Sequence, residues 1–246
     1  MTTLKKRLDQ ILVERDLVAS RQRARGVIMA GLVRVDGKQV DKPGHLVGPS
    51  ASVELTGPDQ PYVSRGGLKL EAALREFHLE VRGLTILDVG ASTGGFTDCL
   101  LQHGARRVFA VDVGYGQLAW PLRKDPRVVI LERTNIRHLQ RLDIDEPLDG
   151  AVIDTSFISL RIVVPATLKL LQKGSFILAL IKPQFEAGKG MVGKGGVISD
   201  PALHKSIIAD LSAFFATIGL TVCGIIESPI LGAKGNREFF IHMNYA

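Results

Sequence analysis

The chain has 246 residues, of which 46% are hydrophobic and 23% charged, so it can form one sizeable domain and one small one and is not expected to be disordered. Its formal net charge of +6 is concentrated in residues 1–45, which contain ten Lys or Arg and five Asp or Glu. No apolar run approaches the length of a transmembrane helix, and the polar amino terminus lacks a secretion-type apolar segment. We therefore expect a cytoplasmic protein and no membrane span.

The two cysteines, Cys99 and Cys223, are too few for a disulfide framework and lack the clustered histidines of a zinc site. Each falls in a predicted helix or strand. We expect two buried core thiols in a reducing compartment, and no metal.

The first part of the chain has the pattern of two helices followed by a hairpin. Apolar residues from Leu8 to Val13 share one helical face, and Ser20 is a favourable N-cap for a second helix that ends at Gly31. Asp36-Gly37 is a strong hairpin signal between residues 32–35 and 38–40. This order brings a group of cations close together: Arg21, Arg23, Arg25, Lys38 and Lys42.

This region resembles the small S4-like RNA-binding module found in a ribosomal small-subunit protein, in some pseudouridine synthases and in tyrosyl-tRNA synthetases. The residues that carry the resemblance are Arg7-Leu8-Asp9, Ser20-Arg21, Ala24, Ile28, Gly31, Val33, Val35, Gly37 and Lys42-Pro43. It implies an α+β RNA-binding domain over residues 1–57, because cations on a rigid helix pair can meet phosphates. The predicted RNA-binding residues are Arg7, Arg21, Arg25, Lys38, Lys42 and, beyond the linker, Arg65.

Residues 58–64 are predicted to be a semi-rigid linker, because proline occupies positions 58 and 61. Residues 65–246 then alternate between strands and helices. Strands are expected at 85–89, 107–112, 128–131, 151–154, 176–181, 221–226 and 238–243, and helices at 68–77, 96–102, 162–171 and 202–218. This order predicts a Rossmann-like, mainly parallel α/β sheet that is finished by an antiparallel pair.

The first of these strands leads into a turn of small residues, from Asp88 to Phe96, that opens a helix. Ser92 occupies the second glycine position of a dinucleotide-binding turn, and a carboxylate at Asp88 suits a cofactor that bears an ammonium and no phosphate. S-adenosylmethionine has these properties. The predicted cofactor-binding residues are Asp88, Gly90, Ala91, Ser92, Gly94, Gly95 and Phe96, with Asp112 for the ribose hydroxyls and Asn135 for the adenine edge. A nicotinamide cofactor and a purely structural turn remain alternatives.

Four ionisable residues stand where an apolar domain has little structural use for them. Lys69 is on the first predicted helix of the second domain, and the other three are Asp154, Lys182 and Glu238 at strand ends. The carboxyl ends of adjacent parallel strands lie beside the cofactor turn in such a sheet. For each residue alone, a solvated strand-end charge is the alternative.

Residues 64–70, 88–96, 154–160, 182–186 and 236–238 together resemble the TlyA family. Its members are often called hemolysins and are related to the FtsJ-type RNA 2′-O-methyltransferases. The resemblance implies a class I S-adenosylmethionine-dependent methyltransferase that acts on ribose in ribosomal RNA, as free RNA or within ribosomal subunits, with no obligate protein partner. The FtsJ-like Lys-Asp-Lys-Glu tetrad corresponds to Lys69, Asp154, Lys182 and Glu238, which are the predicted catalytic residues.

A ribose 2′-hydroxyl is a weak nucleophile that must lose its proton as it attacks a sulfonium methyl. Lys182 is the candidate base, and it is alternatively a cation that stabilises the developing alkoxide. Both roles remain open at this point.

Two other classes of function compete with a methyltransferase. A catalytically silent ribosome-assembly factor would keep the RNA-binding module, and the intact tetrad argues against it. A cytolysin, as the family's name suggests, would need a membrane-inserting element that the sequence does not show.

Overall fold

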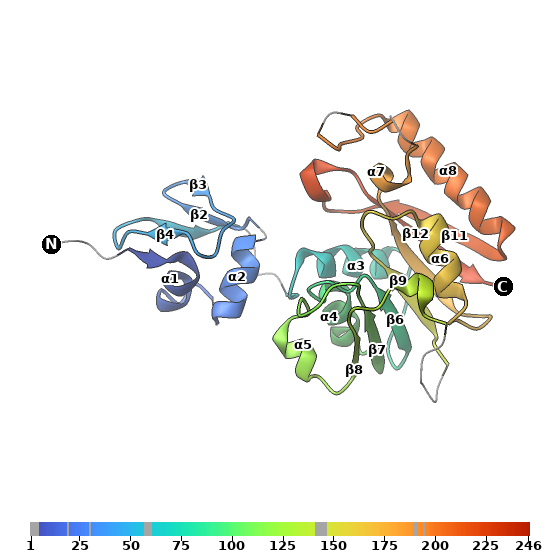
Figure 1. Cartoon of the computed structure of the whole chain (residues 1–246), viewed down its shortest axis with the longest axis horizontal. Helices are drawn as coiled ribbons and strands as arrows, with labels where there is room; N and C mark the ends of the chain where they lie inside the picture. The colour runs from blue at the N-terminus through green and yellow to red at the C-terminus, as the bar shows by residue number, and fades with distance from the viewer. Residues whose placement is uncertain are drawn as a thin grey trace. The chain divides into compact units, whose positions relative to one another are not determined.

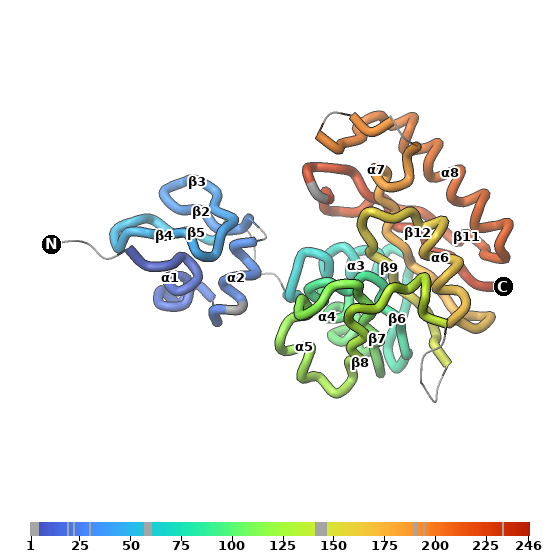
Figure 2. The backbone as a smooth tube through the Cα atoms, viewed as in Figure 1, coloured from blue at the N-terminus to red at the C-terminus, as the bar shows by residue number. Residues whose placement is uncertain are grey.

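The computed structural model describes residues 5–18, 20–29, 31–56, 61–140, 147–188, 191–193 and 195–246, without the side chains of Gln22 and Ala233. The chain divides into two compact units, Met1–Arg65 and Gly66–Ala246, whose paths can be followed in Figures 1 and 2. The predicted domain end at residue 57 and residues 58–60 of the predicted linker lie outside the described residues.

The first unit contains the two expected helices and the expected hairpin. Its elements are β1 (Lys6–Arg7), α1 (Leu8–Glu14), α2 (Arg21–Met29), β2 (Val33–Val35), β3 (Lys38–Gln39), β4 (Leu46–Val47) and β5 (Val53–Leu55). Ser20 caps α2 through its hydroxyl, which accepts from the backbone N–H of Arg23 at 3.2 Å. Asp36 and Gly37 have φ values of 49° and 76°, as a type I′ turn requires. The sheets β3-β2-β5 and β1-β4 cover a core that includes Leu8, Leu12 and Ile28.

The second unit is built on a seven-stranded sheet in the order β11-β12-β10-β9-β6-β7-β8 (Figure 1). Its strands are β6 (Thr85–Val89), β7 (Arg107–Val111), β8 (Val128–Leu131), β9 (Gly150–Ile153), β10 (Phe176–Ile181), β11 (Leu220–Glu227) and β12 (Phe239–Tyr245). Strands β6 to β10 run parallel to one another, and β12 is antiparallel to both β10 and β11. The predicted parallel sheet with a final antiparallel pair is therefore confirmed.

Helices cover both faces of this sheet. The helices are α3 (Arg65–Glu76), α4 (Gly95–Gln102), α5 (Trp120–Lys124), α6 (Leu160–Leu168), α7 (Pro183–Glu186) and α8 (Pro201–Thr217). On β6, Leu87 packs into one core with Val163 of α6 and Leu211 of α8. Because side chains alternate along a strand, Asp88 points to the opposite face, where it contacts Thr97 of α4.

Two features of the second unit differ from the expectations. Cys223 is exposed, and the expectation of a buried thiol is wrong there, because β11 is the edge strand and its register with β12 shifts between Val222 and Gly224. The short helices α5 and α7 were also not expected, since four or five residues carry too little periodicity to predict them. Within the described part of the chain, no helix combines the length and the apolar character that crossing a bilayer would require.

Candidate functional site

Three neighbouring strands bring three of the predicted catalytic residues to one edge of the sheet. Asp154 follows β9, Lys182 follows β10, and Glu238 directly precedes β12. Because β12 runs antiparallel to β10, its beginning lies at the edge where β9 and β10 end, with Phe239 paired to Ile181. Adjacent strands are about 4.8 Å apart, so the register alone places these side chains within reach of one another.

The four ionisable residues form two ion pairs. Nζ of Lys182 lies 2.5 Å from Oδ1 of Asp154, and Nζ of Lys69 on α3 donates to Oε2 of Glu238 at 2.6 Å. Lys182 also donates to Oγ of Ser156 at 2.9 Å. Lys182 and Glu238 are buried, so each buried charge has an opposite charge beside it, as a low-dielectric site demands.

Glu238 is held by a close approach of the backbone that the sequence reasoning missed. A methyl group at Gly232 would overlap Oε1 of Glu238, so only glycine leaves room for the carboxylate. The N–H of Gly232 donates to the carbonyl of Asn236 at 2.8 Å, and the buried Asn236 accepts from the N–H of Ile198 at 3.0 Å. The segment before β12 is thereby fixed to the residues that precede α8.

The small-residue turn after β6 lies directly against the first ion pair. Gly90 has φ +89°, and a Cβ there would lie 2.5 Å from the backbone carbonyl oxygen of Asp154. The N–H of Asp154 in turn donates to the carbonyl of Val89 at 2.9 Å. Gly94, at φ +95°, is needed for a similar reason, since a side chain there would overlap Leu122. These two glycines thus serve the packing of the protein itself.

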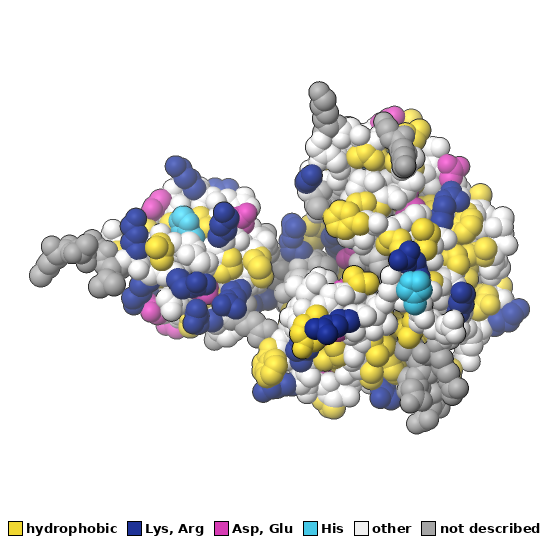
Figure 3. Space-filling model, viewed as in Figure 1, with side chains coloured by type: hydrophobic (Ala, Val, Ile, Leu, Met, Phe, Trp, Pro, Cys, Tyr) yellow, Lys and Arg dark blue, Asp and Glu magenta, His cyan; other side chains and the backbone are white. Residues whose placement is uncertain are grey.

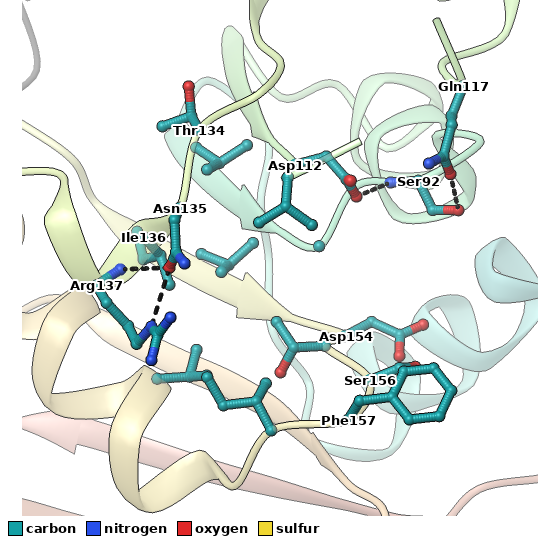
Figure 4. Close-up of a pocket in the computed structure, with 17 residues that line it drawn as sticks. Ser92, Asp112, Gln117, Thr134, Asn135, Ile136, Arg137, Asp154, Ser156 and Phe157 are labelled. Carbon is teal, nitrogen blue, oxygen red and sulfur yellow. Dashed lines mark hydrogen bonds between the residues drawn. The ribbon is translucent and has the colours of Figure 1, made fainter. Parts of the chain in front are cut away.

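A pocket of about 520 Å³ opens beside this turn (Figure 4). Four predicted cofactor-binding residues line it, namely Gly90, Ser92, Asp112 and Asn135, and so does Asp154. Asp112 accepts from the backbone N–H of Ser92 at 2.8 Å and from that of Gly114 at 2.7 Å. Asn135 accepts from the N–H of Arg137 at 3.1 Å. The volume is in the usual range for small-molecule sites.

The remaining predicted cofactor-binding residues are not among those that line this pocket. Ala91 is buried in the turn, and Gly94, Gly95 and Phe96 are buried at the start of α4. Asp88 is completely buried behind the turn, where Oδ2 accepts from the hydroxyl of Thr97 at 2.6 Å. Its Oδ1 has no hydrogen-bond partner among the described residues. Burial raises the pKa of Asp88 to about 7.

The loop after β9 supplies pocket residues whose importance the sequence did not reveal. Ser156 lines the pocket and accepts from Lys182, whereas Lys182 itself is not among the lining residues. Phe157 is 88% exposed with φ +64°, an uncommon conformation for an aromatic residue, and its ring lies 4.9 Å from that of Phe185. Ser156 and Phe157 belong to the motif at residues 154–160 and Phe185 to the motif at residues 182–186, and neither motif predicted these contacts.

Among the predicted RNA-binding residues, the structure brings three together. Arg7, Arg21 and Arg25 all contact the carboxylate of Asp9, a residue that carries the S4-like resemblance but was not expected to hold the arginines together. The others are exposed at separate places: Lys38 on β3, Lys42 in the loop before β4, and Arg65 at the start of α3. Figure 3 shows many Lys and Arg side chains on the visible face of the first unit.

Comparisons with known proteins agree with this architecture. A family model for FtsJ-like methyltransferases matches residues 62–245, and one for the S4 domain matches residues 6–53. The 16S/23S rRNA (cytidine-2′-O)-methyltransferase TlyA of Mycobacterium tuberculosis is 47% identical over 96% of this chain and 88% of its own length. Hemolysin A of Brachyspira hyodysenteriae is 40% identical over 96% of this chain and 98% of its own. The solved structure of a Streptococcus thermophilus protein provisionally named a hemolysin has 42% identity and a TM-score of 0.78, covering 100% of this chain and 90% of that one.

Proposed function

Since the chain belongs to the TlyA family of FtsJ-like methyltransferases, we propose that it transfers a methyl group from S-adenosylmethionine to a ribose 2′-hydroxyl of ribosomal RNA. The observation that carries the proposal is the Lys182–Asp154 ion pair beside the pocket at Gly90. The S4 domain supports RNA as the substrate, and the tuberculosis relative supports ribosomal RNA in particular.

The pocket residues suit S-adenosylmethionine, which supplies an electrophilic methyl on its sulfonium when bound. Asp112 already accepts two backbone N–H groups, and a carboxylate has about four lone-pair sites, so it can still accept from two ribose hydroxyls. Asn135 lies across the same pocket for the adenine edge. The unpartnered Oδ1 of Asp88 is a buried acceptor behind the turn, which supports a cationic group nearby.

The ion pairs position the hydroxyl and receive its proton. Asp154 and Ser156 line the pocket, and Lys182 contacts both of them from behind the pocket wall. From this position its ammonium group stabilises the negative charge that develops on the attacking oxygen. As the hydroxyl oxygen bonds to the methyl carbon, the carbon–sulfur bond of the sulfonium breaks to leave a neutral thioether, and the hydroxyl proton passes to the Lys182–Asp154 pair. Lys69 and Glu238 hold the edge of the site next to this pair.

We also propose that the protein acts in the cytoplasm and that its substrate RNA is part of a ribosomal subunit. An S4 domain whose two helices pack against each other favours structured RNA, which is recognised chiefly by its shape.

The test is methyl transfer in vitro from isotopically labelled S-adenosylmethionine to purified ribosomal subunits and to free ribosomal RNA. We expect label in a 2′-O-methylated nucleotide, identified by mass mapping after nuclease digestion, and no label with Asp154→Ala. Label on a base, or RNA binding without any transfer, would overturn the proposal. The second outcome would favour the assembly factor.

A further inference from the structure

A single buried carboxylate organises the basic surface of the first unit. Asp9, in the first turn of α1, has no exposed surface. Its carboxylate accepts from Nε of Arg7 at 2.9 Å and from Nη2 of Arg7 at 3.1 Å, in the bidentate geometry of an arginine fork. The backbone N–H of Asp9 donates to the carbonyl of Pro43 at 3.1 Å, which fixes the position of the acid.

Two further arginines from α2 converge on the same carboxylate. Nη2 of Arg21 lies 3.2 Å from Oδ2 of Asp9, and Nε of Arg25 lies 3.5 Å from it. The three arginine side chains are 42%, 52% and 57% exposed, so each contacts the acid and still presents donors to solvent. An arginine has five N–H donors, and these contacts use only one or two of them per residue.

The charges of this group do not cancel. Three guanidinium groups surround one carboxylate, which leaves a net charge of +2 on the surface. The arginine hydrogen bonds hold the pKa of Asp9 down at about 2, so the acid is ionised at every physiological pH. The group, which we call the Asp9 cluster (Arg7, Asp9, Arg21 and Arg25), is therefore a fixed cationic site.

We propose that the Asp9 cluster is a pre-organised site for RNA backbone phosphates, in which Asp9 is a positioning residue that never touches the RNA. This inference rests on the proposed function only in taking RNA as the ligand. Long arginine side chains lose rotamer freedom when they bind, and a carboxylate that already holds three of them removes part of that cost. The exposed N–H groups then form the charge-assisted, often bidentate hydrogen bonds that phosphate favours.

Pre-organisation and simple charge make opposite predictions for Asp9→Asn. The substitution raises the net charge by one, so charge alone predicts tighter binding to RNA. Loss of the shared acceptor predicts weaker binding, because the three arginines are no longer held together. The sign of the change therefore separates the two explanations.

The experiment measures the dissociation constant of the full chain for deproteinised ribosomal RNA at two or more salt concentrations. We expect Asp9→Asn to weaken binding by about tenfold and to reduce its salt dependence. The matched control is Asp41→Asn, which adds the same charge at an exposed position of the same unit and should bind as tightly as the wild type or more tightly. Binding by Asp9→Asn that is equal to or tighter than the wild type would overturn the proposal.

A charge-conserving variant keeps the test valid if Asp9→Asn does not fold. Arg21→Lys with Arg25→Lys preserves every charge and removes the arginine geometry, and Arg34→Lys on the exposed face of β2 is its control. We expect the double variant to bind several-fold more weakly and the control to be unchanged, whereas equal affinities would contradict the proposal. Because RNA binding is measured without methyl transfer, failure of the enzymatic proposal would leave these results interpretable.

Discussion

Lys69 and Glu238 are 169 positions apart in the chain, yet the ammonium of Lys69 lies 2.6 Å from Oε2 of Glu238. One residue comes from the first helix of the second unit and the other from the start of its last strand. The Glu238 side chain is only 3% exposed, so this buried ion pair links the first helix of the unit to its last strand.

Removing one member of this pair should cost stability as well as activity. Lys69→Met leaves Glu238 as a buried, unpaired carboxylate, and we expect the free energy of unfolding to fall by about 3 kcal/mol. Lys69→Met combined with Glu238→Gln should recover part of that loss and none of the methyl transfer. Urea denaturation and a turnover assay on the same preparations measure both. Equal stability of the single and double variants would contradict the pairing.

Lys182→Ala should abolish methyl transfer and leave the binding of S-adenosylmethionine nearly intact. The side chain reaches the pocket only through Asp154 and Ser156, so we expect kcat to fall by at least about 100-fold while the Kd for the donor stays within about threefold. Calorimetry and single-turnover kinetics give the two quantities. The exposed Lys173→Ala is the control, and full turnover by Lys182→Ala would exclude Lys182 from the mechanism.

Gly232→Ala should impair catalysis although Gly232 is not charged. The added methyl would displace Oε1 of Glu238, and we expect a drop in kcat of about tenfold with little change in RNA affinity. Gly48→Ala is the matched control, because no atom lies within 4 Å of its added methyl. Equal kcat values for the two variants would show that Glu238 tolerates displacement.

Asp112→Ala should weaken the binding of S-adenosylmethionine by about tenfold or more, since it removes two predicted acceptors and also releases the N–H groups of Ser92 and Gly114. Isothermal calorimetry measures this directly. Asp210→Asn, at an exposed position of α8, is expected to bind the donor like the wild type. Unchanged affinity in Asp112→Ala would place the cofactor ribose elsewhere.

Asp88 should make the second unit less stable as pH rises. Burial raises its pKa to about 7, above the unfolded value of about 3.9, so its stabilising contribution is complete below about pH 4 and is lost as pH rises through 7. The loss is at most about 4 kcal/mol. Asp88→Asn cannot ionise, so its free energy of unfolding relative to the wild type should increase between pH 5 and pH 8. If the free energies of unfolding of Asp88→Asn and the wild type change by the same amount between pH 5 and pH 8, this prediction is contradicted.

The strands were the most predictable part of the fold. β6, β8 and β10 begin and end at the predicted residues, because each is a short apolar run that is bounded by polar or turn residues. β1, β4 and β5 could not be predicted in the same way, since two or three residues do not establish an alternation. Cys223 was placed wrongly because sequence alone does not reveal which strand lies at the edge of a sheet.

The location of the candidate site was easier to predict than its contacts. Strand ends placed Asp154, Lys182 and Glu238 at one edge, and the registers show that they meet there. Which lysine pairs with which acid depends on side-chain directions that no spacing encodes. The contacts of Ser156 with Lys182 and of Gly232 with Glu238 likewise arise only from the folded chain.

The carbonyl of Asp154 occupies the space in front of Gly90, so the wall of the proposed donor pocket and the acid of the ion pair share one piece of backbone. A side chain at Gly90 would push on both at once. Loss of donor uptake and loss of alkylation should therefore be inseparable phenotypes at this position. Genetic suppressors of such an allele would have to move the end of β9 itself.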